Sequence, residues 1–165
     1  MPHVELSLIE DPNRLRANLP SEPGRVPSAR QAPAPAYASS LDRWASVVTS
    51  AVEPSLVLAS DATIVAVSAS CAEMIGITDP ETAHGRRLRE AGVQLVDFTS
   101  SLAELDPSEA DKIPPLLAIS SRRLARGLLR VAHPGTRSAR TIDAIATPLW
   151  DGVTVVGSLT FFSQI

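Results

Sequence analysis

The stretch LLRVAHPGTRSARTIDAIATPLWDGVTVVGSLTFF, residues 128–162, decides the fold. Two turn dipeptides, Pro-Gly at residues 134–135 and Asp-Gly at residues 151–152, divide it into three runs, of which the first is mostly apolar and the other two are rich in β-branched residues. Such turns between such runs are typical of hairpins, so we expect three consecutive antiparallel strands. The last run alternates apolar and hydroxyl-bearing residues, which predicts one buried face and one face that is at least partly wet.

The segment before these strands predicts helices. Pro114 and Pro115 are tolerated only in the first turn of a helix, and the apolar residues that follow predict a helix ending at Gly127. Residues 86–111 contain buried-type apolar positions and an acidic loop but favour no single assignment.

Further upstream, two short β-branched runs separated by Asp61-Ala62 predict a hairpin. A short helix over ASCAEMIG, closed by Gly76, follows the hairpin. Residues 77–85 then predict another turn of helix, because Asp79 and Pro80 are typical helix-starting residues.

The N-terminal part of the chain changes character at about Ser39. Residues 1–38 hold half of the chain's prolines among Ser, Ala and Arg, a composition that predicts a flexible arm. Residues 39–53 predict an amphipathic flanking helix from Leu41 to Val52, and Asp42 is placed to form a capping box with Ser39.

Taken in order, these elements predict an α+β domain over residues 54–165. We expect a five-stranded antiparallel sheet with short helices on one face and the flanking helix before it.

This arrangement resembles the PAS sensor domain family, and the resemblance runs from about Pro54 to Phe162. The stretches that carry it are PSLVLASDATIVAVSASCAEMIG (54–76), HGRRL (84–88) and IATPLWDGVTVVGSLTFF (145–162). They resemble the family's opening hairpin and small-residue helix, the segment before its middle, and its closing hairpin. The family often has Gly and Asn where this chain has Ala62 and Ser68, although the Ser68 hydroxyl can still cap the next helix.

Composition excludes several classes of function. The 165 residues carry 15 basic and 18 acidic side chains, which gives no global basic surface for nucleic acid. No apolar run is long enough to cross a membrane. With one cysteine, Cys71, and no secretory signal pattern, we expect a cytoplasmic protein, and the resemblance, which is to bacterial PAS modules in particular, implies a bacterial one.

Catalysis and metal binding find little support in the sequence. The histidines are His3, His84 and His133, and no carboxylate partner for His84 is identifiable. No zinc, calcium or phosphate-binding motif occurs. We therefore expect no catalytic residues and no metal, and we interpret Cys71 as a buried structural residue.

The resemblance implies where a cofactor or ligand would lie. The segment HGRRLREAG lacks the reactive cysteine of flavin-binding members, so covalent flavin is excluded. The predicted central helix lacks histidine, which does not favour haem and leaves the cofactor unknown. The family's cavity between sheet and helices would take a small apolar ligand, although the same residues equally describe a filled core. Its expected lining is Leu56, Leu58, Met74, Ile75, Leu117, Val155, Leu159 and Phe161.

Two surfaces are candidates for a partner. One is the apolar side of the flanking helix, which in the PAS family often packs across the sheet or between two subunits; the other is a locally basic stretch. The residues are Leu41, Trp44 and Val48 on the helix, and Arg122, Arg123 and Arg126 in the stretch.

The sequence therefore predicts a signalling sensor or protein-interaction module that forms a homodimer and regulates an effector protein in trans. No output domain fits into the roughly 40 residues before the domain, so we expect output through another chain unless this chain is a fragment of a larger sensor. The alternatives are a small cofactor-binding protein or enzyme that uses His84, and a purely structural dimerisation module.

Overall fold

The computed structural model describes residues 39–99, 101–132 and 138–165. The predicted flexible arm, residues 1–38, lies outside these residues, as do His3 and His133. No helix within the described ranges is both long and apolar enough to span a bilayer.

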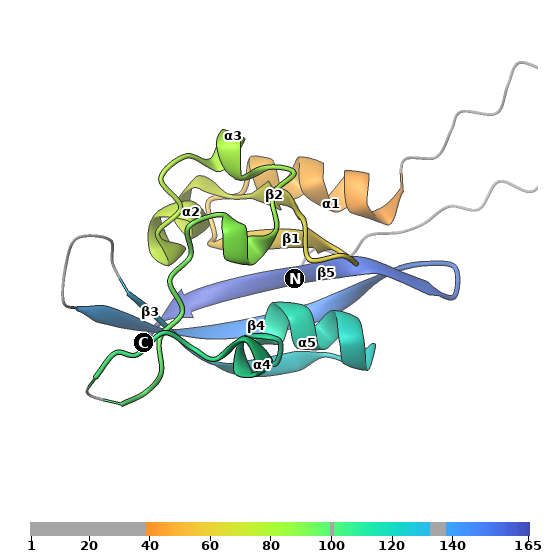
Figure 1. The fold of residues 1–165 in the computed structure, drawn as a ribbon. Helices are drawn as coiled ribbons and strands as arrows, with labels where there is room; N and C mark the ends of the chain where they lie inside the picture. The colour runs from red at the N-terminus through yellow and green to blue at the C-terminus, as the bar shows by residue number, and fades with distance from the viewer. Residues whose placement is uncertain (1–38, 100, 133–137) are drawn as a thin grey trace, which may run out of the picture. The chain divides into compact units, whose positions relative to one another are not determined.

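Five antiparallel strands form one sheet in the order β2-β1-β5-β4-β3 (Figure 1). The first hairpin and the C-terminal meander meet where β1 pairs with β5, so strands from the two ends of the domain lie side by side in the middle of the sheet. This confirms the predicted fold class, including the three consecutive C-terminal strands. The strands are β1 (Ser55–Ala59), β2 (Ile64–Val67), β3 (Ala125–Ala132), β4 (Ala139–Asp151) and β5 (Thr154–Gln164).

The short helices follow their sequence signals. Ser68 caps α2 (Ala69–Ile75) by accepting a hydrogen bond from the Cys71 N–H at 3.2 Å. Gly76 ends α2 with a φ of 81°, a conformation that glycine adopts without steric cost. The remaining short elements are α3 (Pro80–Ala83), the 3₁₀ helix η1 (Leu88–Glu90) and α4 (Pro107–Ala110).

Helix α5 (Pro114–Ser121) begins at the predicted prolines but is shorter than expected. Arg122 ends it in the left-handed conformation, with a φ of 59°, and β3 has already begun when the chain reaches Gly127. The expectation that Gly127 ends this helix was therefore wrong. Gly127 instead lies in β3, where a Cβ would be 3.4 Å from the Pro114 ring, so its missing side chain lets α5 pack closely on the strand.

The sheet carries helices on both faces. Figure 1 shows α1 (Ser40–Thr49, orange) above β5 and α5 (teal) below it. Neighbouring strand residues point to opposite faces, and accordingly Leu56 and Leu58 belong to the core under the short helices while Val57 belongs to the α1 cluster. We call the first the inner face and the second the outer face.

Helix α1 is held to the outer face by both capping and packing. Ser39 and Asp42 form the predicted capping box, a type of cap that contributes about 1 kcal/mol to helix stability. Leu41, Ala45 and Val48 then pack against the outer face of the sheet. Most of the apolar side of the flanking helix is therefore buried against its own chain.

Candidate functional site

The interior between the sheet and the short helices is almost filled. A void of about 10 Å³ remains, close to the volume that one water molecule needs. Its walls come from the sheet, α2, η1 and α5 together with the segments that join them: Leu56, Ile75, Leu88, Val93, Leu95, Ile113, Pro115, Leu129, Val131 and Phe162. A ligand the size of even a short hydrocarbon would have to open this core.

The predicted cavity residues do not all gather around this void. Leu56 and Ile75 line it, and Leu58 is buried in the same core. Met74 packs against the edge of that core, whereas Leu117 on α5 is 37% exposed. The predicted residues of the first hairpin and α2 therefore lie on the inner side of the sheet, whereas Leu117 on α5 is partly open to solvent.

For β5 the predicted orientation was wrong. Leu159 is buried in the α1 cluster on the outer face, and Phe161 is 46% exposed. Val155, near the hairpin end, is partly buried and belongs to none of the described core clusters. The residues of β5 that point inward are Ser158, Thr160 and Phe162, so the strand turns its hydroxyl-bearing side to the interior.

The two inward hydroxyl groups differ in their hydrogen bonding. The Ser158 Oγ donates to the carbonyl oxygen of Pro115 at 2.8 Å and so ties β5 to α5. Thr160 is completely buried opposite Ala146, and its Oγ1 has no hydrogen-bond partner within the described part of the chain. A buried hydroxyl without a partner costs stability.

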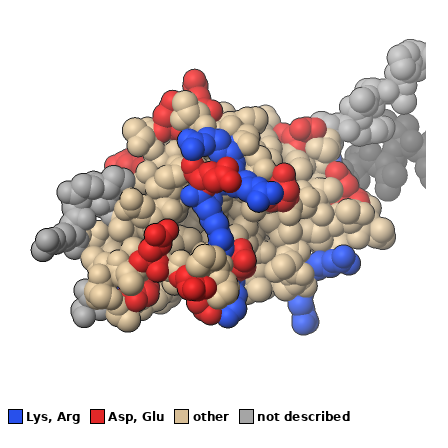
Figure 2. Space-filling model, in the orientation of Figure 1, with Lys and Arg blue, Asp and Glu red and all other residues tan. Residues whose placement is uncertain are grey.

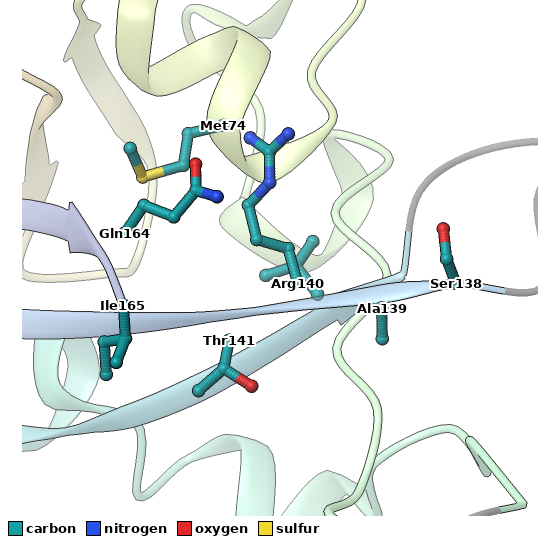
Figure 3. Close-up of a pocket in the computed structure, with 8 residues that line it drawn as sticks. Met74, Ser138, Ala139, Arg140, Thr141, Gln164 and Ile165 are labelled. Atoms are coloured by element: carbon teal, nitrogen blue, oxygen red, sulfur yellow. The ribbon is translucent and has the colours of Figure 1, made fainter.

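A larger hollow lies at the end of the sheet that carries the C-terminal residue. It has a volume of about 420 Å³, and side chains from α2, β3, β4 and β5 border it. Met74, Gln164 and Arg140 gather on one side of it (Figure 3). Ser138 also lines it.

On the outer face, α1 covers some of the apolar surface and leaves another part open. Leu128 on β3, Ile145 on β4 and Phe161 on β5 are 51%, 40% and 46% exposed. Ile145 pairs directly with Phe161, and Leu128 lies diagonally across from Ile145 on the neighbouring strand. We call these three residues the outer patch. The sequence analysis singled out only Phe161, and for the wrong face.

The predicted partner surface on α1 is largely consumed by intramolecular packing. Val48 is 1% exposed, and Leu41 is packed in the same cluster, so neither is free to bind a second subunit. Their assignment to a partner surface was wrong. Trp44, by contrast, remains partly exposed on the flank of the helix.

The three arginines of the predicted basic stretch do not have the same surroundings. Arg126 forms an ion pair with Asp143, in which its Nη2 lies 2.6 Å from a carboxylate oxygen, and this hydrogen bond lowers the pKa of Asp143. Arg122 and Arg123 are exposed at the turn after α5 and form no ion pair with a described residue. In the face drawn in Figure 2, basic and acidic side chains are mixed rather than gathered into one area of a single sign.

The structure adds little to the chemical candidates. His84 is exposed at the end of α3 and has no hydrogen-bond partner among the described residues. Cys71 is buried, and its burial raises the pKa of the thiol, which keeps it protonated. No three His, Cys, Asp or Glu side chains of residues 39–99, 101–132 and 138–165 come together as a metal site.

Comparison with solved structures identifies the architecture. A PAS domain from Colwellia psychrerythraea superposes with a TM-score of 0.52 at 16% identity, covering 76% of this chain and 96% of that one. The PAS domain of BvgS from Bordetella pertussis superposes with a TM-score of 0.53 at 15% identity, and the match covers 76% of this chain and 85% of that one. The light-state LOV domain of the blue-light photoreceptor Aureochrome1 superposes with a TM-score of 0.51 at 19% identity, and the match covers 72% of this chain and 86% of that one. No family model and no curated protein sequence matches the chain.

Proposed function

We propose that this chain, which has the PAS fold, is a cytoplasmic bacterial signalling module that acts through protein contacts rather than catalysis. It forms a homodimer through the outer patch, and it regulates an effector protein in trans. The dimer positions a surface for the effector, and a change in subunit contact changes the effector's activity. A signal can shift the balance between two dimer arrangements only if some contact is stronger in one arrangement than in the other, and we propose that the outer face makes this contact.

The observation that supports this proposal is the contrast between the two faces of the sheet. The inner face leaves a void of about 10 Å³, whereas the outer face leaves Leu128, Ile145 and Phe161 open to solvent on three adjacent strands. Adjacent exposed apolar side chains on a sheet face are typical of interaction sites. The partly exposed Trp44 of α1 adds an aromatic side chain of the type enriched in protein interfaces.

The test is sedimentation velocity on the full chain with one charge introduced into the outer patch. We expect a dimer for the unaltered chain at tens of micromolar, and Phe161→Glu should weaken dimerisation by at least about tenfold while the domain stays folded. Phe98→Glu is the matched control, because Phe98 is another exposed aromatic residue, at 59%, and lies outside the outer patch. It should leave the dimer unchanged.

Two results would contradict the proposal. A monomeric unaltered chain would remove the homodimer, and a dimer insensitive to Phe161→Glu would place the interface elsewhere. Val48→Glu is not a suitable variant for this test, because Val48 is buried between α1 and the outer face of the sheet and the substitution would disrupt folding.

A further inference from the structure

Strand β3 ends the sheet, and its free edge is covered over only half of its length. The segment before α4 pairs with the C-terminal half, where Ala132 N–H donates to the Gln94 carbonyl and Val96 N–H donates to the Arg130 carbonyl, both at 2.9 Å. Beyond Val96 the chain leaves the strand, as the Asp97 N–H bonds to Ala103 instead. The edge before Arg130 therefore has no paired strand among the described residues.

The pairing pattern identifies which backbone groups are open there. The N–H and C=O groups of one strand residue point to the same side, and the side alternates from residue to residue. Because Arg130 and Ala132 point away from β4, Arg126 and Leu128 do so as well. Their backbone groups form no hydrogen bond to another described residue on this side, which leaves donors and acceptors open along roughly 7 Å of strand.

A groove runs beside this open edge. Its volume is about 250 Å³, and it lies between β3 and the segment from Leu95 to Pro114. The apolar part of its wall is Leu95, Val96, Phe98, Leu105, Ile113 and Pro114. If a further strand paired with this edge, every second side chain of that strand would point into the groove and contact these apolar residues.

The charges of the groove favour an acidic occupant. Its charged lining residues are the basic Lys112, Arg126 and Arg130 and the acidic Glu109. Glu109 is already paired with Lys112 at 2.6 Å, and Arg126 is paired with Asp143 at 2.6 Å. The excess positive charge of the groove therefore belongs to Arg130, whose guanidinium contacts only backbone carbonyls among the described residues. A second copy of β3 fits poorly, because antiparallel pairing would bring the arginines of the two edges together.

We propose that the free edge of β3 binds an extended segment of a partner protein in which apolar and acidic residues alternate. The segment adds as a sixth strand, its backbone pairs with Arg126 and Leu128, its apolar side chains enter the groove, and its carboxylates face the basic rim. This site shares Leu128 with the outer patch, but it uses the backbone of Leu128 at the strand edge rather than its exposed side chain. The Phe161→Glu variant, in which the proposed homodimer is lost, therefore tests it separately.

The test uses two capped eight-residue peptides on the full chain, one alternating leucine with glutamate and one alternating leucine with lysine. Fluorescence anisotropy measures binding, and NMR hydrogen exchange follows the Leu128 amide. We expect the glutamate peptide to bind at least about tenfold more tightly than the lysine peptide and to slow exchange at Leu128. The same result is expected in Phe161→Glu, which separates this site from the proposed dimer.

Leu128→Pro removes the edge donor, and the matched control Leu128→Ala removes the side chain but keeps the donor. Proline is tolerated on an edge strand when its nitrogen faces away from the sheet. Because Leu128 also belongs to the outer patch, both substitutions are made in the Phe161→Glu background. There we expect Leu128→Pro to weaken binding of the glutamate peptide by about tenfold and Leu128→Ala by less than about threefold. Should Leu128→Pro fail to fold, a glutamate peptide with N-methylated backbone amides replaces it, and this peptide should not bind.

Three results would overturn the proposal. One is unchanged exchange at Leu128 in the presence of the glutamate peptide. Another is equal binding of the two peptides or of the N-methylated one. The third is a self-association of the Phe161→Glu variant that protects the Leu128 amide without any peptide, because the occupant of the edge would then be a second copy.

Discussion

Ile145 on β4 and Phe161 on β5 lie directly opposite each other on the outer face, and each keeps more than a third of its surface open to solvent, 40% and 46% respectively. Paired residues on adjacent strands normally stabilise a sheet by packing together, and their remaining exposed area favours a further contact. This pair lies in the middle of the meander, where a second subunit can reach both side chains at once.

If a second subunit covers this pair, thermal stability depends on protein concentration, because dissociation accompanies unfolding. We expect Tm of the full chain to rise by roughly 5 °C between about 1 and 100 μM. In Phe161→Glu the Tm should be independent of concentration. Differential scanning fluorimetry at the two concentrations makes the comparison, and equal slopes for the two proteins would contradict the proposed interface.

Gly157 holds the contact between the sheet and α1. A Cβ at this position would lie 2.0 Å from the Leu58 carbonyl oxygen and 2.8 Å from Leu41 Cδ2. We expect Gly157→Ala to lower the free energy of unfolding by about 3 kcal/mol, since backbone must move to make room. The control, Gly127→Ala, places its methyl group 3.4 Å from the Pro114 ring and should cost about 1 kcal/mol or less. Urea unfolding measures both, and equal losses would show that the crowding at Gly157 is relieved at little cost.

The two inward hydroxyl groups of β5 should respond in opposite ways to removal. Thr160→Val replaces an unpartnered buried hydroxyl with a methyl group, and we expect the free energy of unfolding to rise by about 1 kcal/mol. Ser158→Ala breaks the bond to the Pro115 carbonyl and should lower it by about 1 kcal/mol. Chemical denaturation tests both variants. A destabilised Thr160→Val would mean that the Thr160 hydroxyl has a partner in solution, such as a water molecule in the neighbouring void.

Stability should fall in acid because folding lowers the pKa of three carboxyl groups. The causes are hydrogen bonds from Arg126 to Asp143, from Thr63 to Asp61 and from Ser108 to Asp106. A lowered pKa in the folded state gives stability that is present above the unfolded value, near pH 4, and is lost as the pH falls through the folded value. The urea midpoint should therefore decrease from pH 5 to pH 3. Asp143→Asn should make this decrease smaller, and an identical pH profile would assign the effect to other groups.

The local signals in the sequence predicted the local structure well. The capping box of Ser39 and Asp42, the Ser68 cap and the Gly76 terminus each depend on residues a few positions apart, and each is present. The end of α5 was missed because it depends on a left-handed conformation at Arg122, and an arginine gives no sequence signal for such a turn.

The orientation of β5 could not be predicted from alternation alone. A period of two separates the faces of a strand but does not say which is interior, and hydrophobicity was the criterion used. Because α1 covers the outer face, Leu159 is buried there, while Ser158 and Thr160 fit beneath α5 on the inner face. Both faces of this strand are buried near its centre, so hydrophobicity does not distinguish them.

The outer patch left a signal that the sequence analysis did not use. In β4 the buried residues Ile142, Ala144 and Ala146 share one face, and Ile145 stands on the other. On that face its neighbours along the strand are Asp143 and Thr147, and a large apolar residue between two polar ones indicates a contact beyond the domain's own core. Its partner across the sheet, Phe161, became recognisable only once the register of β4 and β5 was known.

Native mass spectrometry of the gently purified full chain tests the central claim most directly, because one spectrum reports both subunit number and any retained small molecule. The account predicts a dimer at twice the chain mass with nothing added, and loss of that dimer in Phe161→Glu. A monomer that carries a defined added mass would contradict it, because the domain would then be acting through an opened interior rather than through its outer face.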